Sequence, residues 1–356
     1  MYAANALGKL ALMRFARSSN SFHYVFVMRL LALVATVTLV ILPGLGCRAT
    51  MPIPASPELT IHTPSDYSFP AHDTLTVATW NVEHFVDTHD NPYIDNQREN
   101  TPDVATVEKR LEWFAQGLRA IDADVLVLQE FESTVFAQAL ADTLVPDLGY
   151  RFVTGTDKGS WYQNVVILSR LPLGPVQSFA AAFTPIEGQS DDDGTPANQM
   201  LTNHRMFSAE VLVRPGTVAT VIGAHLKAGR GDRNAGWRMG QIRALHKQLT
   251  AIRVLAPDRT VFVAGDLNLL PDSPEYSLLL NVDRTQGPVA FIDALPDGMS
   301  GYTHASDDLQ RRLDYVLHNA EMAPHLIDIE VLQPLPAAVM PDMSDHLPVR
   351  ARYRVQ

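Results

Sequence analysis

The sequence feature that most constrains the fold is a repeated pattern in which a short apolar run, rich in β-branched residues, ends in a polar residue. Runs of this kind are typical of strands buried on both faces. The runs are LTVATW before Asn81, ADVLVLQ before Glu130, TVATVIGA before His225, TVFVAG before Asp266, and RRLDYVLH with Asp314 inside it. Ligands of α/β sheets gather where strands end, so we expect these polar side chains to lie at one edge.

Helical patterns lie between several of these predicted strands. Residues 106–121 place Val107, Leu111, Phe114 and Leu118 at helical spacing, and residues 237–249 repeat the pattern. Strands that alternate with amphipathic helices indicate an α/β domain.

The N-terminal part of the chain has a different composition. Residues 1–47 contain basic residues, then an apolar run and Cys47, which is the order of an export signal. Cys47 is in the position of the lipidated cysteine of a bacterial lipoprotein. The alternatives are a plain cleaved signal, or an uncleaved anchor on a run that is short for a membrane span. Met28 is an alternative start. Residues 48–72, rich in Pro, Ser and Thr, are predicted to be a tether, and residues 73–356 the folded domain.

All three interpretations of the N-terminus place the domain outside the cytoplasm, in the cell envelope or the extracellular space. The predicted domain is acidic, since the whole chain has a net charge of −11 and residues 1–72 contain more basic than acidic residues. The sequence has no Lys/Arg-rich run, which argues against a broad basic face that grips duplex DNA. It does not exclude a nucleic-acid substrate held by a local basic patch and a bound cation.

The polar residues at the predicted strand ends indicate a class of chemistry. Carboxylates and amides are ligands for Mg²⁺, Mn²⁺ or Ca²⁺. The sequence has one cysteine and no HExxH motif, so a structural or protease-type zinc site is not expected. A hard cation beside histidines suits phosphoester hydrolysis, in which the cation neutralises phosphate charge and a histidine transfers a proton.

Seven short motifs resemble those of the endonuclease/exonuclease/phosphatase superfamily, and particularly its secreted bacterial members. They occur in the family's order. The motifs are TWNVEHF (79–85), LQEFE (128–132), VILSR (166–170), HLKAG (225–229), GDLN (265–268), LDYVL (313–317) and SDHLP (344–348). The resemblance implies an α/β, four-layer sandwich of two packed mixed β-sheets flanked by helices, with the active site at one edge.

The resemblance also implies roles for individual residues. Asn81, Glu130 and Asp345 would bind a divalent cation, with Mg²⁺ expected first and Mn²⁺ or Ca²⁺ as alternatives. Asp266 and Asn268 would position the attacking water and the scissile phosphate. His346 would be the base, oriented by Asp314, and His225 would contact the phosphate. Further candidates for substrate contact are Asn164, Lys227 and Arg238. His84 and His304 are candidates for lining the cleft, and Glu132, Tyr162 and Asn164 for supporting His225.

Three functions follow from these observations. The first is a nuclease-type phosphodiesterase acting on nucleic acid outside the cytoplasm, attached to the membrane through its N-terminal signal or lipid. The second is a lipid or inositol-phosphate phosphodiesterase or phosphatase, and the third is a binding lipoprotein without catalysis. A family resemblance fixes the reaction class better than the substrate. No protein partner is inferred.

Overall fold

The computed structural model describes residues 61–89, 102–157, 161–179, 182–201, 205–280, 291–295 and 301–355. The predicted export signal and most of the predicted tether therefore lie outside the described residues. Within those ranges, no helix combines the length and the apolar character that a membrane crossing requires.

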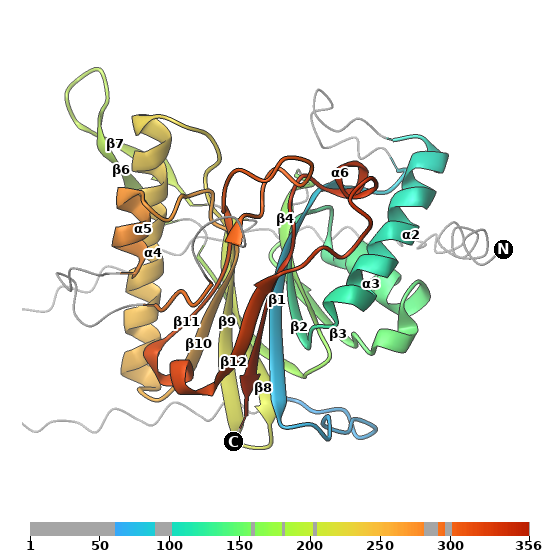
Figure 1. Ribbon diagram of the computed structural model, residues 1–356. Helices are drawn as coiled ribbons and strands as arrows, with labels where there is room; N and C mark the ends of the chain where they lie inside the picture. The colour runs from blue at the N-terminus through green and yellow to red at the C-terminus, as the bar shows by residue number, and fades with distance from the viewer. Residues whose placement is uncertain are drawn as a thin grey trace, which may run out of the picture. The chain divides into compact units, whose positions relative to one another are not determined.

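Two mixed β-sheets form the centre of the domain (Figure 1). The six-stranded sheet has the order β12-β13-β1-β2-β4-β3. Its strands are β1 (Thr74–Phe85), β2 (Val125–Phe131), β3 (Phe152–Gly155), β4 (Asn164–Ser169), β12 (Leu326–Val331) and β13 (Val349–Arg354). The five-stranded sheet has the order β11-β10-β9-β8-β5. Its strands are β5 (Leu173–Ser178), β8 (Met206–Arg214), β9 (Thr217–His225), β10 (Thr260–Asp266) and β11 (Asp314–His318). A separate hairpin pairs β6 (Phe183–Ser190) with β7 (Pro196–Met200).

Helices cover the outer faces of both sheets (Figure 1). On the six-stranded sheet these are α2 (Val104–Ile121) and α3 (Thr134–Thr143), and on the five-stranded sheet α4 (Asp232–Leu255) and α5 (Pro274–Leu280). Shorter elements are η1 (Pro146–Leu148), η4 (Ala320–His325) and α6 (Met340–Met343). The predicted four-layer α/β sandwich is thus confirmed.

The core follows from the alternation of side chains along a strand. In β1, Val77 packs into the core between the two sheets, whereas Ala78 and Trp80 pack into the second core beneath α2 and α3. Strand β2 repeats this division with Val127 and Leu128. Both faces of these strands are buried, which explains their nearly continuous apolar sequences.

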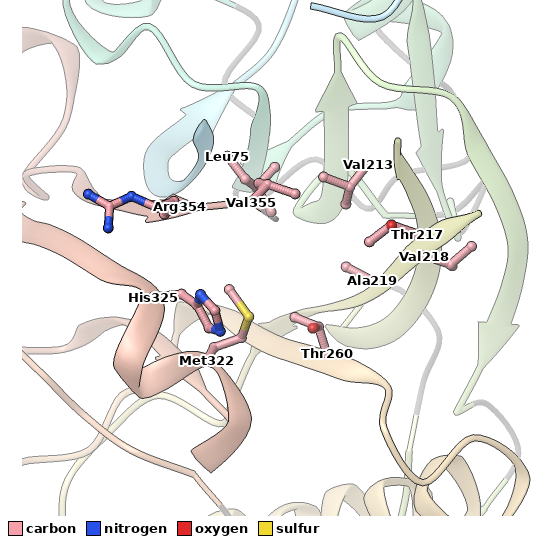
Figure 2. A pocket seen from close by; sticks show the side chains of 10 residues that line it. All are labelled: Leu75, Val213, Thr217, Val218, Ala219, Thr260, Met322, His325, Arg354 and Val355. Carbon is pink, nitrogen blue, oxygen red and sulfur yellow. The ribbon is translucent and has the colours of Figure 1, made fainter. Parts of the chain in front are cut away.

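Parallel pairing brings the chemistry-bearing residues to one end of the sandwich. Strand β1 runs parallel to β2 with α2 between them in sequence, and β9 runs parallel to β10 with α4 between them. The carboxyl ends of these four strands carry Asn81, Glu130, His225 and Asp266. At the start of β9 and β10 lies instead a small cavity of about 170 Å³ with a mainly aliphatic lining (Figure 2). The two ends of the sandwich therefore differ in chemistry.

Candidate active site

Strand register places Asp266 between two other predicted site residues. It lies directly opposite His225 of β9 on one side and Asp314 of β11 on the other. His225 Nε2 is 3.6 Å from Asp266 Oδ2. All three side chains are buried, so the five-stranded sheet alone fixes this row of acidic and imidazole groups.

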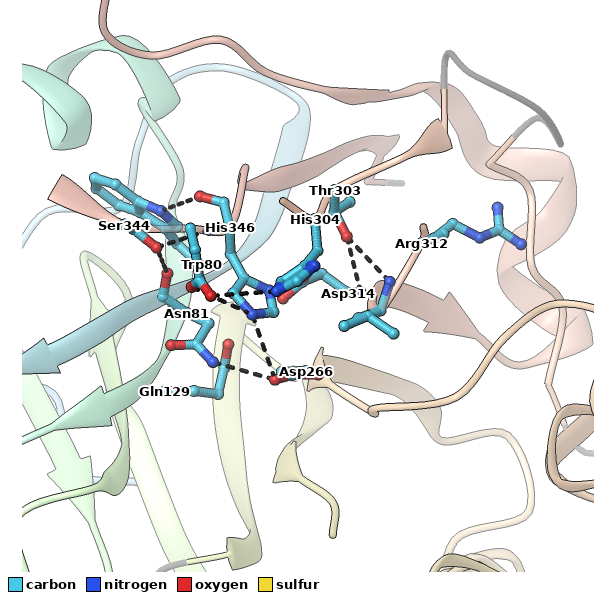
Figure 3. A network of polar contacts seen from close by, with 12 residues as sticks. Trp80, Asn81, Gln129, Asp266, Thr303, His304, Arg312, Asp314, Ser344 and His346 are labelled. Atoms are coloured by element: carbon cyan, nitrogen blue, oxygen red, sulfur yellow. Dashed lines mark hydrogen bonds and ion pairs between the residues drawn. The ribbon is translucent and has the colours of Figure 1, made fainter. Parts of the chain in front are cut away.

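His346 and Asp314 form a buried pair. Nδ1 of His346 lies 2.7 Å from Oδ2 of Asp314, and Figure 3 shows the network around them. With Nδ1 facing the carboxylate, Nε2 is directed toward Asp266 Oδ2 at 3.9 Å and Asp345 Oδ1 at 3.6 Å. Burial by itself would lower the pKa of His346, but Asp314, Asp266 and Asp345 together raise it well above its ordinary value. His346 therefore binds a proton strongly in this acidic setting.

The backbone around His346 is anchored to the six-stranded sheet. Trp80 Nε1 donates to the His346 carbonyl oxygen at 3.1 Å. Ser344 Oγ accepts a hydrogen bond from the His346 amide at 3.0 Å and donates to the Asn81 carbonyl oxygen at 2.7 Å. Asp314 belongs to one sheet and these anchors to the other, so the pair bridges the two sheets (Figure 3).

Asp266 accepts hydrogen bonds from two predicted site residues. Asn81 Nδ2 donates to Oδ2 at 3.1 Å, and the Asn268 backbone amide donates to Oδ1 at 2.9 Å. Burial raises the pKa of Asp266 to about 7, and the nearby Asp314 carboxylate adds to the rise against the opposing effect of His346. A carboxylate in such a setting benefits from a cation or a shared proton.

Glu130 lies beside Asn81, as predicted for a pair that binds a cation. Asn81 Nδ2 is 3.4 Å from Glu130 Oε1. The other oxygen, Oε2, accepts from Gln163 Nε2 at 2.8 Å and from the His84 amide at 3.2 Å. The structure thus brings Asn81, Glu130 and Asp266 together where the two sheets meet.

Four residues with left-handed backbone surround this site. They are Glu83, His84, Glu130 and Asn268, each with φ between 44° and 58°. Pairing is irregular between Asn81 and Phe85 on β1 and between Leu128 and Phe131 on β2. Positive φ in non-glycine residues costs about 1 kcal/mol or more and clusters at functional sites. These irregular strand ends turn side chains toward one another, a purpose that bulges often serve.

Asp345 joins the site through two histidines and Glu83. Its Oδ2 lies 3.2 Å from His304 Nε2, and its amide donates to Glu83 Oε2 at 2.9 Å. His304, Asp345 and His346 offer ligand atoms that all lie within 4.8 Å of one another. In the described part of the chain, Glu130 does not belong to that group. The predicted cation ligands Asn81, Glu130 and Asp345 therefore border the same site without forming one tight cluster.

Arg311 determines the tautomer of His304. Its Nη2 lies 3.0 Å from His304 Nδ1 and can only donate, so Nδ1 accepts and the proton of a neutral His304 is on Nε2, facing Asp345. The hydrogen bond from His304 opposes the effect of burial and lowers the pKa of Asp345. His304 is therefore better suited to orient Asp345 than to bind a cation itself.

The donor set fits a hard divalent cation. Oxygen atoms from Asn81, Glu130 and Asp345 are the ligand type that Mg²⁺ and Mn²⁺ prefer. Burial and the Asp345 carboxylate raise the pKa of Glu83, and burial raises that of Asp266, so negative charge here is only partly compensated by the protein. A cation would offset this excess of acidic groups.

The three residues predicted to contact substrate have different surroundings. Asn164 is fully buried and its Nδ2 donates to the carbonyl oxygens of Glu132 and Trp161, which argues against direct substrate contact. Arg238 is also buried; it donates to Glu275 and to the Lys227 and Gly229 carbonyl oxygens, so it holds the loop after β9. Lys227 is half-buried at the end of β9 and remains a candidate.

Several neighbours of the site were not predicted. Gln163 contacts Glu130, Arg205 Nη1 lies 3.3 Å from His225 Nδ1, and Glu83 contacts Asp345. Glu83 had a detectable signal, since it stands two residues after Asn81 and so on the same side of a strand. Gln163 and Arg205 directly precede β4 and β8 and carried no comparable signal. His304, a candidate for lining the cleft, lies beside His346, with ring centroids 4.8 Å apart.

Comparison with known proteins identifies the family and the fold of the chain. The model of the Endonuclease/Exonuclease/phosphatase family matches residues 78–346. No curated protein matches the chain. An endonuclease/exonuclease/phosphatase from Beutenbergia cavernae has 20% identity and a TM-score of 0.52, over 80% of this chain and 72% of that one.

Two further solved structures share the fold. The beta toxin of Staphylococcus aureus has 18% identity and a TM-score of 0.52, over 78% of this chain and 99% of that one. The D. rerio TDP2 in complex with a single-strand DNA product has 18% identity and a TM-score of 0.51, over 79% and 99%. Similarity at this identity shows the fold alone.

Proposed function

Because the chain belongs to the endonuclease/exonuclease/phosphatase family, we propose that it is a metal-dependent phosphodiesterase of the nuclease type. The observation that carries the proposal is the buried pair of His346 and Asp314, whose free ring nitrogen is directed toward Asp266. A histidine held by a carboxylate in one tautomer is suited to transferring a proton at its other nitrogen.

Each side chain of the site has a task in this proposal. A cation bound at the neighbouring carboxylates would lower the pKa of His346 again, so that its neutral ring can accept the proton of the attacking water at Nε2 while Asp314 stabilises the imidazolium. Asp266 and the side-chain amide of Asn268 orient that water and the phosphate, and a side-chain amide donates to a phosphate oxygen without adding charge. His225 accepts from Arg205 at Nδ1, so its Nε2 carries the proton and can donate to a phosphate oxygen.

Asn81, Glu130 and Asp345 would hold the divalent cation, with Mg²⁺ as the first expectation and Mn²⁺ as an alternative. When bound, the cation supplies charge neutralisation for the phosphate. Neighbouring residues orient two of these ligands. Gln163 and the His84 amide orient Glu130, and His304 orients Asp345. Preorganised groups of this kind avoid reorganisation during the reaction.

Nucleic acid is the proposed substrate. One structural neighbour was solved with a single-strand DNA product, which supports the same substrate class for this chain. The N-terminal sequence supports export, with Cys47 as a site of lipid attachment in the cell envelope. Metabolic labelling with a fatty acid tests this part, since a Cys47→Ser variant should lose the label and the envelope fraction.

The test of the proposed reaction is cleavage of supercoiled plasmid and labelled RNA by the full chain. The reactions contain Mg²⁺, Mn²⁺ or EDTA, with a His346→Ala variant beside the unmodified protein. His325→Ala is a matched control, because His325 lines the cavity at the opposite end of the sandwich. Cleavage that requires the cation and is lost only in His346→Ala supports the proposal. If neither the plasmid nor the RNA is cleaved, the proposal is contradicted.

One observation favours a lipid phosphodiesterase as the second candidate. Phe183 and Met200 face each other across the β6–β7 hairpin and are 72% and 55% exposed. An exposed apolar pair can contact a membrane surface. The hairpin turn contains Asp191, Asp192 and Asp193, however, and an acidic turn is repelled by anionic lipid. Faster hydrolysis of phospholipid vesicles than of nucleic acid would favour this candidate.

A further inference from the structure

Arg110 of α2 is a half-buried residue that lies behind the end of β1, next to the candidate active site. Its Nη2 donates to the carbonyl oxygens of Val82 at 2.7 Å, Glu83 at 2.6 Å and Met343 at 2.9 Å. Its Nη1 donates to the His84 carbonyl oxygen at 3.0 Å. One guanidinium group thus binds four backbone carbonyl oxygens, and three of them belong to consecutive residues of β1.

These three carbonyl oxygens converge because the end of β1 turns. In a regular strand, successive carbonyl groups point to opposite sides. Glu83 and His84 instead have left-handed backbone, with φ of 44° and 48°, and the regular pairing of β1 with β2 is interrupted after Asn81. Such backbone costs free energy and persists where surrounding contacts fix it. Arg110 supplies contacts of this kind, since it offers a donor to each carbonyl oxygen of the turn.

The same turn contacts all three residues that are predicted to bind the cation. The Glu83 amide donates to Asn81 Oδ1 at 3.0 Å, and the His84 amide donates to Glu130 Oε2 at 3.2 Å. The Glu83 carboxylate accepts from the Asp345 amide through Oε2 at 2.9 Å. The backbone of two residues therefore sets where the three ligands lie relative to one another.

The fourth carbonyl oxygen connects the turn to the segment that carries Asp345. Met343 is the last residue of α6 and stands two residues before Asp345. Because Arg110 binds Met343 and residues 82–84 at once, it holds two parts of the site that are distant in sequence. Its Cζ also lies 5.2 Å from the centroid of the Phe85 ring, so a planar guanidinium is held by its face and by its edges.

We propose that Arg110 is a positioning residue of the cation site, which holds the turn at residues 82–84 against residue 343 and thereby fixes Asn81, Glu130 and Asp345 for a divalent cation. The inference rests on the proposed function, because it concerns the cation which that function requires. Arg110 acts through the backbone and not by contact with the cation. A purely structural link between α2 and β1 would instead affect the melting temperature alone.

Calorimetric titration of the full chain with Mg²⁺ and with Mn²⁺, without substrate, tests the proposal. Arg110→Met removes all four hydrogen bonds and keeps an unbranched side chain beside Phe85. We expect it to weaken Mg²⁺ binding about 10- to 100-fold, as is usual when a residue that orients metal ligands is lost. Arg110→Lys keeps the charge but lacks the planar fork of donors, so its affinity should lie between those of Arg110→Met and the unmodified protein.

Arg170→Met is the matched control. The Arg170 guanidinium also lies 5.2 Å from an aromatic ring, that of Tyr150, and its Nε donates to the Leu148 carbonyl oxygen at 2.8 Å. Arg170 follows β4, which is antiparallel to β2, so it lies at the opposite end of the sheet from Glu130. This change should lower the melting temperature and leave the affinity for Mg²⁺ unchanged.

The outcomes separate this proposal from the proposed function. Unchanged Mg²⁺ affinity in Arg110→Met, an equal loss of affinity in Arg170→Met, or no binding of either cation by the unmodified protein would overturn the positioning role. If Arg110→Met does not fold, Arg110→Lys decides, because an affinity equal to that of the unmodified protein would overturn the role and a weaker one would support it. If no substrate is cleaved but cation binding depends on Arg110, the proposed function fails and the positioning role stands.

Discussion

At the scale of single residues, the site depends on which atom carries each proton. Asp314 is completely buried, and its Oδ2 is 2.7 Å from His346 Nδ1. A buried carboxylate is costly unless it is paired, so this contact stabilises both groups and fixes the histidine tautomer. The same logic applies to Arg311, His304 and Asp345, where an arginine determines which nitrogen faces the carboxylate.

We predict that Asp314→Asn lowers kcat about 10²- to 10⁴-fold. An asparagine amide can donate toward Nδ1 and would favour the tautomer that leaves Nε2 protonated and unable to accept a proton. The measurement is kcat on the best substrate, together with the melting temperature. Asp293→Asn is the control, because it also removes a buried carboxylate, there paired with Arg312 at 2.7 Å. A kcat for Asp314→Asn within tenfold of the unmodified protein would contradict the proton-transfer role.

His304→Ala should raise the Mg²⁺ concentration for half-maximal activity about tenfold, because Asp345 loses the donor that orients it. Saturating Mg²⁺ should then restore most of kcat, as expected of a positioning residue. Calorimetric titration of Mg²⁺ provides a readout that does not depend on activity. If the metal affinity is unchanged and only kcat falls, His304 acts on substrate rather than through Asp345.

Some residues of the site could be predicted from the local sequence, and others could not because only the tertiary structure brings them to the site. Asn81, Asp266 and Asp345 stand in short motifs at strand ends or tight turns, so local sequence was enough to single them out. Gln163 reaches the site because β4 pairs with β2, which is distant in sequence, and Arg205 because the β8–β9 hairpin brings it beside His225. The burial of Asn164 and Arg238 could not be read from the sequence, because a polar residue beside a motif gives no sign of whether its donors are used internally.

At the scale of secondary structure, the register of β9, β10 and β11 aligns His225, Asp266 and Asp314. Gly265 makes this close pairing feasible. A Cβ atom at this position would lie 1.7 Å from the Ala224 carbonyl oxygen, well inside van der Waals contact. The glycine of GDLN is therefore required by the approach of β9 to β10 and not by the chemistry.

Gly265→Ala should destabilise the domain by about 2–4 kcal/mol, because either the strands separate or the peptide shifts. It should also lower activity by displacing Asp266. Urea unfolding measures the first effect. Gly216→Ala is the matched control, since Gly216 has φ 80° with open space around it and should cost only about 1 kcal/mol. Equal losses in the two variants would show that steric contact with Ala224 is not the cause.

The sequence predicted the existence of these elements better than their limits. Helix α4 extends from Asp232 to Leu255, beyond the predicted residues 237–249, because its glycine- and asparagine-containing first turns lack the apolar spacing that marks a helix. Strand β1 continues past Asn81 to Phe85 through an irregular stretch that alternation alone does not reveal. Pairing with β2, and not local propensity, sets that end.

At the scale of the whole domain, the site exists only while the two sheets remain packed. Asn81 and Glu130 come from one sheet, and His225, Asp266 and Asp314 from the other. His318, the last residue of β11, links the two sheets. Its Nδ1 lies 3.1 Å from the hydroxyl oxygen of Tyr353 of β13. Both side chains are completely buried, and His318 Nε2 has no hydrogen-bond partner among the described residues.

This buried histidine predicts that the domain loses stability as the pH falls below neutral. Burial lowers the pKa of His318 to about 4 from its ordinary 6.5, so between these values the unfolded chain binds more protons than the folded domain. The stabilising contribution is therefore complete above pH 6.5 and declines toward pH 4. Between pH 7 and 5, His318 should account for a loss of about 2 kcal/mol in the free energy of unfolding.

Urea unfolding at both pH values tests this prediction. His318→Gln should reduce the difference in the free energy of unfolding between pH 7 and 5 by that amount, whereas His62→Gln, which changes an exposed histidine, should not. The same difference in all three proteins would exclude His318 as the source of the acid sensitivity.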